Sequence, residues 1–316
     1  NKKYQIILNT FYSNGKLLLT GEYLVLEGAT ALAVPTKFGQ DLSVEKIKEP
    51  QLIWGSFTNT GDCWFEAVFE LPKLRLVQAT FNSDSDGSAD FIAETLQDIL
   101  SETRKLNPEF LQSEQGFLVK TNLTFPRDWG LGTSSTLINN IAQWAKVDAF
   151  QLLWNSFSGS GYDIANAKHK TPILYQVNNQ QPVVKKVDFR PSFSDQLFFV
   201  HLNKKQDSKA GIARFKEKRE KINNEIQLVS EISKQLIHEQ KLSEFEKLIH
   251  EHEKIISSII ELPTVKERLF PDYFGTLKSL GAWGGDFILA TGDKNTPHYF
   301  KTKGYTTILS YSDMVL

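Results

Sequence analysis

Residues suited to phosphate binding are concentrated in one stretch, Pro126–Thr136, which reads Pro-Arg-Asp-Trp-Gly-Leu-Gly-Thr-Ser-Ser-Thr. Its two glycines permit a tight turn and let a ligand approach the backbone, because no Cβ stands in the way. Four hydroxyl side chains follow, where a helix would have unpaired N–H groups and the positive end of its dipole. The stretch therefore predicts an anion site, and phosphate is the usual anion there. No Gly-Lys-Ser/Thr closes it as in a Walker A loop, and a helix start without a ligand is the alternative.

Three further stretches carry residues that could do chemistry. Ser158–Ala167 is rich in small residues and holds Asp163, the only carboxylate between Asp148 and Asp188. From its sequence alone, Asp163 is better explained by a turn or a helix cap than by catalysis. Gly15-Lys16 opens a predicted strand, and a lone lysine beside a turn is usually solvated. Gly281–Asp286 is a second glycine-rich turn before a strand, where the backbone can approach a ligand.

The elements that would position these stretches follow from hydrophobic periodicity. Strands are predicted at 4–9, 16–27, 41–46, 51–57, 63–70, 116–125, 172–177, 183–188, 197–202, 287–291 and 305–311. Helices are predicted at 91–100, 136–147 and 148–156, with helical stripes over 222–236 and 242–259. Ser13-Asn14-Gly15 reads as a turn between the first two strands, Asn59–Asp62 as a hairpin turn, and Asp188–Asp195 as the best linker.

Composition excludes several classes of protein. The 316 residues are 41% hydrophobic and 23% charged, as in a globular protein, and the length suffices for two domains. The net charge of -1 opposes generic nucleic-acid binding, which needs a positive field. No apolar run approaches about 18 residues, so we expect neither a membrane span nor a signal peptide. A single cysteine, Cys63, fits a reducing, cytoplasmic location, with the thiol as a packed side chain.

Two polar segments have alternative interpretations. Asn82–Asp90 has the acidic spacing of a calcium loop, but Ala93 stands where the bidentate Glu belongs, which favours a solvated loop. Residues 204–221 contain eight Lys or Arg against three acids, so a solvated helix face is favoured over a phosphate-binding patch. His250 and His252 are two residues apart and cannot share a helix face, which disfavours a metal site.

Taken together, the motifs resemble those of the GHMP kinases, the superfamily of galactokinase, homoserine kinase, mevalonate kinase and phosphomevalonate kinase. They occur in the family's order, as Gly15–Tyr23, Pro126–Thr136 and Gly281–Asp286, with Gly161-Tyr162-Asp163 between the last two. The likeness is greatest to small bacterial members with a Gly-Tyr-Asp-Ile-Ala signature and to phosphomevalonate kinases. The resemblance implies a two-domain α+β fold. We place a ribosomal-protein-like N-terminal α/β domain at 1–190 and a ferredoxin-like C-terminal domain at 191–316.

The resemblance also implies roles for individual residues. Asp163 matches the aspartate that takes the acceptor's hydroxyl proton, and Lys16 matches the lysine that keeps it ionised and stabilises the transferring group. Ser134 matches the serine that holds Mg²⁺. The phosphates of ATP would lie on Gly130, Leu131, Gly132, Thr133, Ser134 and Ser135. The acceptor substrate would contact Glu22, Tyr23, Gly161, Tyr162, Gly284 and Gly285.

The sequence departs from the family's pattern at several positions. Leu152 stands where mevalonate kinases have a Mg²⁺-binding Glu, and Gln151 or Asp148 is a candidate to replace it. In the third motif, Trp283 replaces the usual Gly and Leu280 the usual Ser or Thr. Trp283 can be interpreted either as an aromatic side chain packed in the interior or as one that stacks on the substrate. In the first motif Asn14 replaces a common proline, which should change only the turn.

The favoured function is an ATP- and Mg²⁺-dependent kinase for a small molecule of the mevalonate or phosphomevalonate type. A sugar or homoserine-type kinase remains open within the same class. A non-catalytic nucleotide or metabolite sensor is favoured by the missing Glu and disfavoured by the retained Lys16, Ser134 and Asp163. We expect no nucleic-acid or membrane partner. The sequence leaves open the acceptor and whether the chain forms a homodimer.

Overall fold

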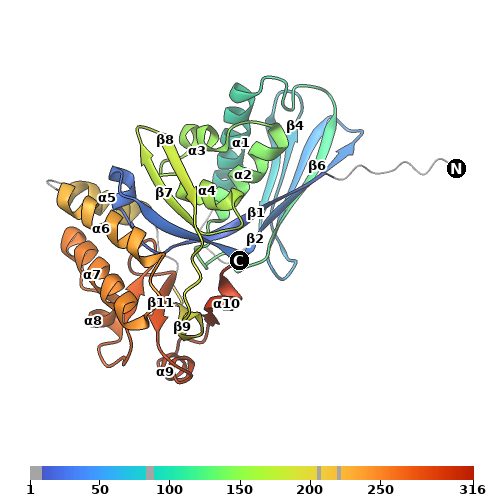
Figure 1. The fold of residues 1–316 in the computed structure, drawn as a ribbon. Helices are drawn as coiled ribbons and strands as arrows, with labels where there is room; N and C mark the ends of the chain where they lie inside the picture. The colour runs from blue at the N-terminus through green and yellow to red at the C-terminus, as the bar shows by residue number, and fades with distance from the viewer. Residues whose placement is uncertain (1–8, 83–88, 205–207, 219–221) are drawn as a thin grey trace. The chain divides into compact units, whose positions relative to one another are not determined.

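A computed structural model describes residues 9–82, 89–204, 208–218 and 222–316, and the chain forms two compact units (Figure 1). The first unit contains the chain up to Gly15 together with Phe38–Arg127 and Gly132–Gly159. The second contains Lys16–Lys37, Asp128–Leu131 and Ser160–Leu316. Each unit is assembled from three separate segments of the chain. The domains at 1–190 and 191–316 stay a prediction.

The sheet of the first unit has the strand order β5-β4-β3-β6-β2, and β1 also pairs with β2. Its strands are β1 (Asn9–Leu18), β2 (Ala31–Ile47), β3 (Gln51–Phe57), β4 (Cys63–Glu70), β5 (Arg75–Phe81) and β6 (Gly116–Leu123). β3 and β6 are parallel, and the β2–β6, β3–β4 and β4–β5 pairs are antiparallel. Side chains alternate along β4, where Phe65 and Phe69 are buried and Glu66 is exposed. This alternation is what places one face of the sheet against the core.

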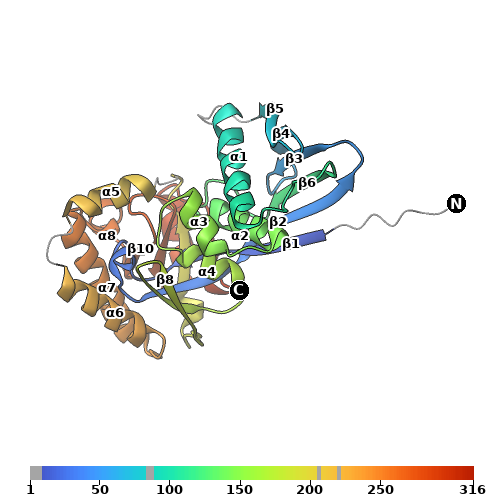
Figure 2. The same ribbon diagram turned by 90° about the horizontal axis from the view of Figure 1, so that it is seen from above.

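Three helices pack together against one face of this sheet (Figure 2). They are α1 (Ala89–Leu106), α2 (Thr133–Ala145) and α3 (Ala149–Ser156). In α1 the residues Ala93, Leu96, Ile99 and Leu100 are buried, at the spacing of one helix face. The first unit is thus a helix layer on a sheet, with α2 beginning directly after the glycines of Pro126–Thr136, the stretch predicted to bind phosphate.

The second unit contains a four-stranded antiparallel sheet of order β10-β11-β9-β12. Its strands are β9 (Leu197–His201), β10 (Leu277–Ser279), β11 (Phe287–Thr291) and β12 (Ile308–Ser310). Between β9 and β10 lie α5 (Ser208–Lys218), α6 (Asn223–Leu236), α7 (Leu242–Ile260) and α8 (Val265–Leu269), and α9 (Thr296–Thr302) lies between β11 and β12. α10 (Tyr311–Met314) ends the chain. The succession of strand, helices, two strands, helix and strand is the ferredoxin-like arrangement, as predicted.

The second unit also holds the elements around the first and third motifs. β2 contributes to both units, because its residues 31–33 pair with β7 (Ile173–Asn178) and its residues 40–47 pair with β6. β7 continues into β8 (Gln181–Lys186). A 3-10 helix at Leu24–Glu27 and α4 (Tyr162–Lys168) complete this part. α6 and α7 bury one stripe each, with Val229, Ile256 and Ile260 packed around Tyr23 and Trp283.

Several sequence predictions are confirmed and others are wrong. β3, β4 and β11 have the predicted bounds. The turn predicted at Ser13–Gly15 is wrong, because β1 runs through it, and the strand predicted at 16–27 ends at Leu18. Of the strand predicted at 4–9, only Asn9 lies within the described residues. The predicted loop at 83–88 and parts of the basic segment, 205–207 and 219–221, lie outside them. In the described part of the chain, no helix is both long and apolar enough to cross a bilayer.

Candidate active site

The helix α2 begins with unpaired groups, as an anion site requires. Gly132, the residue before its first turn, has φ of 92°, a conformation that favours glycine, and no side chain caps the helix. Thr133 and Ser134 have no hydrogen-bond partner for their hydroxyls among the described residues, and Ser134 is exposed. Ser135, in contrast, donates to the carbonyl of Gly132 at 2.9 Å. The start of α2 therefore presents free donors to solvent.

Buried polar contacts within the first unit fix the position of α2. Thr136 donates from its hydroxyl to Oε1 of Gln40 at 2.7 Å, and Asn140 donates to the backbone carbonyl of Gln40 at 2.9 Å. Ser13 donates to Oδ1 of Asn140 at 2.7 Å. These contacts explain why Ser13 lies in a strand rather than in a turn, since its hydroxyl is satisfied by a helix more than a hundred residues later.

Residues around the missing Mg²⁺-binding Glu offer little for a metal. Leu152 is fully buried in α3. Asp148 caps α3 by accepting the N–H of Gln151 at 2.9 Å, and Gln151 itself is exposed. Within the described ranges, no group of three or more His, Cys, Asp or Glu side chains could hold a metal ion. Ser134 is the predicted metal ligand that remains available, and its role stays a prediction.

Lys16, in the second unit, is tied to the stretch that precedes α2. Its backbone N–H donates to the carbonyl of Leu131 at 3.0 Å, and its Nζ donates to the carbonyl of Gly130 at 2.8 Å. Nζ also lies 5.7 Å from the centre of the Tyr162 ring. Burial alone lowers the pKa of the Lys16 ammonium, but its interactions with Tyr162, Asp163 and Asp286 outweigh it and raise that pKa. Lys16 is thus a charged ammonium at neutral pH, beside Asp163.

Asp163 lies in the first turn of α4, and hydrogen bonds fix the backbone before and after it. Gly161 precedes this helix with φ of 88°, and Oδ1 of Asp163 accepts the N–H of Ile164 at 3.0 Å. Tyr175 on β7 donates its hydroxyl to the carbonyl of Ser160 at 2.5 Å. The sequence-predicted pair of Lys16 and Asp163, and the predicted acceptor residues Gly161 and Tyr162, therefore lie together in one unit.

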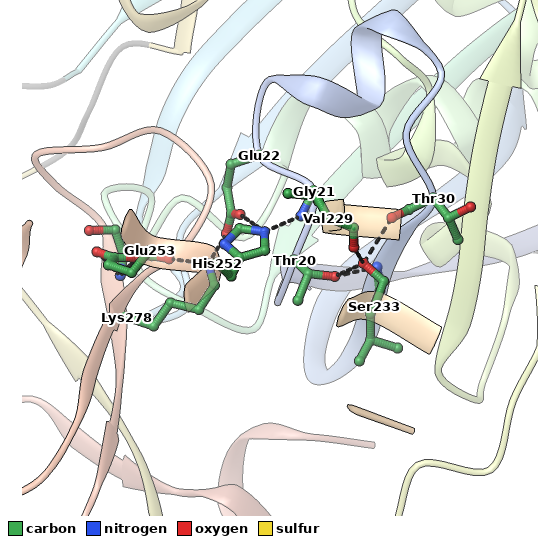
Figure 3. A network of polar contacts seen from close by, with 11 residues as sticks. Thr20, Gly21, Glu22, Thr30, Val229, Ser233, His252, Glu253 and Lys278 are labelled. Atoms are coloured by element: carbon green, nitrogen blue, oxygen red, sulfur yellow. Dashed lines mark hydrogen bonds and ion pairs between the residues drawn. The ribbon is translucent and has the colours of Figure 1, made fainter. Parts of the chain in front are cut away.

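Glu22, predicted to contact the acceptor, lies in a buried polar network (Figure 3). Its Oε1 accepts Nζ of Lys278 at 2.6 Å, and both side chains have no exposed surface. Its Oε2 lies 3.3 Å from Nε2 of His252, but that nitrogen accepts the N–H of Gly21 at 2.9 Å. Burial, and then Lys278, lowers the pKa of His252 well below its ordinary value, so the imidazole is neutral. Glu22 therefore faces a lysine and a neutral histidine rather than solvent.

Two buried polar atoms of this network lack a hydrogen-bond partner among the described residues. Because Nε2 of His252 is an acceptor, the ring proton is on Nδ1. Nδ1 of His252 and Oε2 of Glu22 have no hydrogen-bond partner in the described part of the structure. Burial raises the pKa of Glu22 despite the opposing charge of Lys278. The network holds the Gly21-Glu22 turn in place at the cost of unsatisfied polar groups.

Glu253 adds a second carboxyl to the same network. It is buried, and both its oxygens accept the N–H of Ser279, at 3.0 and 3.1 Å. Burial raises the pKa of Glu253 to about 7, against the effects of Lys278 and the Ser279 N–H, and the charge of Glu22 adds to the rise. The carboxyl is therefore close to half ionised at neutral pH.

Glu253→Gln should stabilise the protein increasingly as the pH rises. Because the folded protein binds this proton more tightly than the unfolded chain does, the stability that it contributes is fully present below the ordinary carboxyl pKa of 4.5 and is lost as the pH rises through about 7. A shift of this size corresponds to about 3 kcal/mol. Glutamine stays neutral, so the variant should gain on wild type as the pH rises from about 4.5 to about 7 in urea unfolding, and the difference should stay constant above that range. A pH-independent difference would contradict this.

Tyr23 and the third motif meet inside the second unit. Tyr23 is buried, stacks on Phe215 with ring centres 5.8 Å apart, and accepts the backbone N–H of Trp283 through its hydroxyl at 3.0 Å. Trp283 is buried in the same apolar cluster, and its Nε1 has no partner among the described residues. Gly284, with φ of 110°, and the buried Gly285 follow directly. Of the two interpretations, the packed aromatic describes Trp283 in this structure.

Sequence reasoning missed Asp286, the last residue of the third motif. A Cβ on Gly130 would lie 2.3 Å from Cγ of Asp286, so the carboxylate rests against the glycine that Lys16 also contacts. His201 on β9 was also missed, and its Nε2 lies 3.1 Å from the carbonyl of Asp128. Asp286 lies at the end of a glycine-rich turn, and this position could have identified it in the sequence. Nothing in the local sequence marked His201.

Comparison with known structures identifies the fold. The chain is 14% identical to mevalonate kinase of Methanococcus jannaschii, with a TM-score of 0.65 over 97% of this chain and 98% of that one. It is 16% identical to the Streptococcus pneumoniae phosphomevalonate kinase solved with phosphomevalonate and AMPPNP, with a TM-score of 0.63 over 98% of both chains. For Lactococcus lactis galactokinase solved with galactose, the identity is 13% and the TM-score 0.64, over 96% and 93%.

The chain therefore has the two-part α+β fold of the GHMP kinases over nearly its whole length, as the motifs predicted. No protein-family model and no curated protein sequence matches it.

Proposed function

We propose that this protein is an ATP-dependent phosphotransferase that acts on a hydroxyl or phosphate group of a small molecule. The observation that carries the proposal is the contact of Lys16 with the carbonyls of Gly130 and Leu131 while its ammonium interacts with Asp163. A general base, a cation and the backbone that leads into an uncapped helix are thereby connected. These are the parts that phosphoryl transfer requires of a protein.

The residues at the start of α2 fit the phosphates of ATP. The uncapped first turn and the free hydroxyls of Thr133 and Ser134 supply donors for anionic oxygens. Ser134 is the residue we assign to Mg²⁺. ATP with Mg²⁺ would supply the transferable phosphoryl group and neutralise its charge.

The side chains of the second unit would carry out the proton transfer. Asp163 would accept the proton of the acceptor's hydroxyl, since a carboxylate within reach of that group can act as a general base. Lys16 would keep Asp163 ionised before transfer and stabilise the negative charge that develops. Only one residue, Leu131, separates Gly130 from Gly132, so the peptide chain itself links Lys16 to the phosphate-binding helix.

We favour an acceptor of the mevalonate or phosphomevalonate type, on the motif resemblance and on the phosphomevalonate kinase of this fold that was solved with phosphomevalonate. Because Glu22 is buried against Lys278, we assign the acceptor to Tyr162 and Asp163, which both interact with Lys16. A sugar acceptor is the competing choice, since galactokinase shares the fold. The absence of the Mg²⁺-binding Glu at Leu152 favours a nucleotide sensor as the second candidate function.

An ATP-consumption assay with Mg²⁺ tests the proposal. The acceptors are mevalonate, phosphomevalonate, homoserine and common sugars, and the Asp163→Asn variant is the control. Turnover with one acceptor that disappears in the variant would support both the reaction and its base. ATP binding without turnover on any acceptor would support the sensor, and failure to bind ATP would overturn both functions.

Ser134→Ala should raise the Mg²⁺ concentration needed for half-maximal activity by about tenfold, the loss expected for one contact to a charged group. Excess Mg²⁺ should restore part of the activity. Ser135→Ala is the matched variant, because its hydroxyl is already bonded to Gly132. An equal shift in both variants would remove the specific role of Ser134.

A further inference from the structure

Asp286 and Lys16 contact the same glycine from different sides. A Cβ on Gly130 would lie 2.3 Å from Cγ of Asp286, and 2.4 and 2.7 Å from its two carboxylate oxygens. The carboxylate thus occupies the space that any other residue at this position would need. On its carbonyl side, Gly130 accepts Nζ of Lys16 at 2.8 Å. Gly130 is therefore enclosed between a carboxylate and an ammonium.

The backbone of Asp286 fixes the direction of its side chain. Its φ of 54° lies in the left-handed region, which aspartate tolerates better than most residues. Its N–H donates to the carbonyl of Lys204 at 2.7 Å, and its carbonyl accepts the N–H of Leu202 at 2.8 Å. β11 begins at the next residue, Phe287. The carboxylate is thus presented by the rigid central sheet of the second unit.

Two carboxylates interact with the ammonium of Lys16, although a general base needs only one. The groups that interact with its ammonium are Tyr162 and Asp163 of α4, Asp286 before β11 and the carbonyl of Gly130. Glu22 interacts in turn with Tyr162. With both aspartates ionised, one ammonium and two carboxylates give a local charge of -1. If Asp163 takes a proton, the three groups become neutral together.

Without Asp286 the same proton transfer would have a different result. Lys16 and Asp163 alone are neutral before the transfer, and protonation of Asp163 would leave the ammonium unpaired. An uncompensated charge away from water is unfavourable. The second carboxylate therefore assists the step that the proposed reaction needs.

We infer that Asp286 is a positioning residue of the phosphoryl transfer: it keeps Lys16 paired and in place at Gly130 while Asp163 takes the proton of the acceptor. This inference rests on the proposed function. The competing explanation is that Asp286 only shapes the turn before β11, which asparagine would do equally well.

Asp286→Asn separates these explanations, since asparagine keeps the size and the tolerance of the left-handed backbone and removes the charge. We expect kcat to fall by about tenfold to about a hundredfold, with the KM for ATP unchanged within about twofold. The exposed Asp195, replaced by asparagine, is the control for removing one carboxylate from the same unit. A kcat equal to that of wild type would overturn the inference.

A thermal-unfolding cycle without nucleotide tests the contact itself. Asp286→Asn should lower Tm in the wild-type background, because Lys16 loses a partner, and leave Tm unchanged or raise it in the Lys16→Met background, where two carboxylates repel each other. Equal Tm changes in both backgrounds would overturn the inference. If wild type has no turnover on any acceptor, the proposed function fails in that form, and the sign of this cycle alone decides whether Asp286 acts through Lys16.

Discussion

Asp163→Asn is expected to reduce kcat by about a thousandfold, the middle to upper range for loss of a general base. Asparagine cannot take the proton of the acceptor. Its side-chain oxygen can still accept the N–H of Ile164, as Oδ1 of Asp163 does at 3.0 Å, so α4 should keep its first turn. Binding of AMPPNP, measured by calorimetry, should change by less than about threefold.

The same two measurements show how the assignment of Asp163 could fail. A variant with more than about a tenth of wild-type kcat would remove Asp163 as the base. A variant that loses both turnover and AMPPNP binding would indicate damage to the fold, and Asp163→Glu then separates the loss of the acid group from the loss of structure. Some activity should return with glutamate, because it restores a carboxylate at a displaced position.

Lys16→Met has the second largest expected effect, a fall in kcat of about a hundredfold to about a thousandfold. The ammonium that stabilises the transferring group is lost, and Asp163 loses its counter-ion. The backbone bond from Lys16 to the carbonyl of Leu131 remains, so the chain should keep its path. Replacing a half-buried charge by an apolar side chain also removes a desolvation cost. Stability should therefore change less than turnover does.

Lys16→Arg is the matched variant, because it keeps the positive charge and changes only its shape. It should retain more activity than Lys16→Met when kcat and Tm are measured for both. Wild-type kcat in Lys16→Met would exclude the lysine from the reaction. A collapse of Tm in both variants, with kcat lost in proportion to the unfolded fraction, would make Lys16 a structural residue.

The sequence predicted best those elements whose pattern is local. β11 appeared at its predicted bounds because five consecutive buried residues form a short apolar run between a glycine-rich turn and a polar loop. α2 was predicted from its apolar stripe and begins three residues early, at Thr133, because the helix extends into the hydroxyl residues. The fold class followed from the order of the motifs.

Predictions failed where distant residues decide the local structure. Ser13-Asn14-Gly15 has the composition of a turn, yet it lies in β1 because Asn140 satisfies Ser13. The pairing of Glu22 with Lys278 joins residues 256 positions apart. The sequence around Glu22 does not indicate that this acidic residue is buried. The assigned roles of Glu22, Tyr23 and the glycines remain predictions.

The interleaving of the two units has a consequence for synthesis on the ribosome. The chain passes from one unit to the other after Gly15, Lys37, Arg127, Leu131 and Gly159. All residues of the first unit have been synthesised once residue 159 has emerged. Domains generally fold as they are made, so this unit can fold at that point. The segments with Lys16 and Gly130 must then wait for partners made later, including Asp163 and finally Asp286. The group that we assign to catalysis is thus among the last parts of the nascent protein to assemble, and a chain cut short after residue 159 would carry Lys16 and the helix that we assign to phosphate, without Asp163 and Asp286.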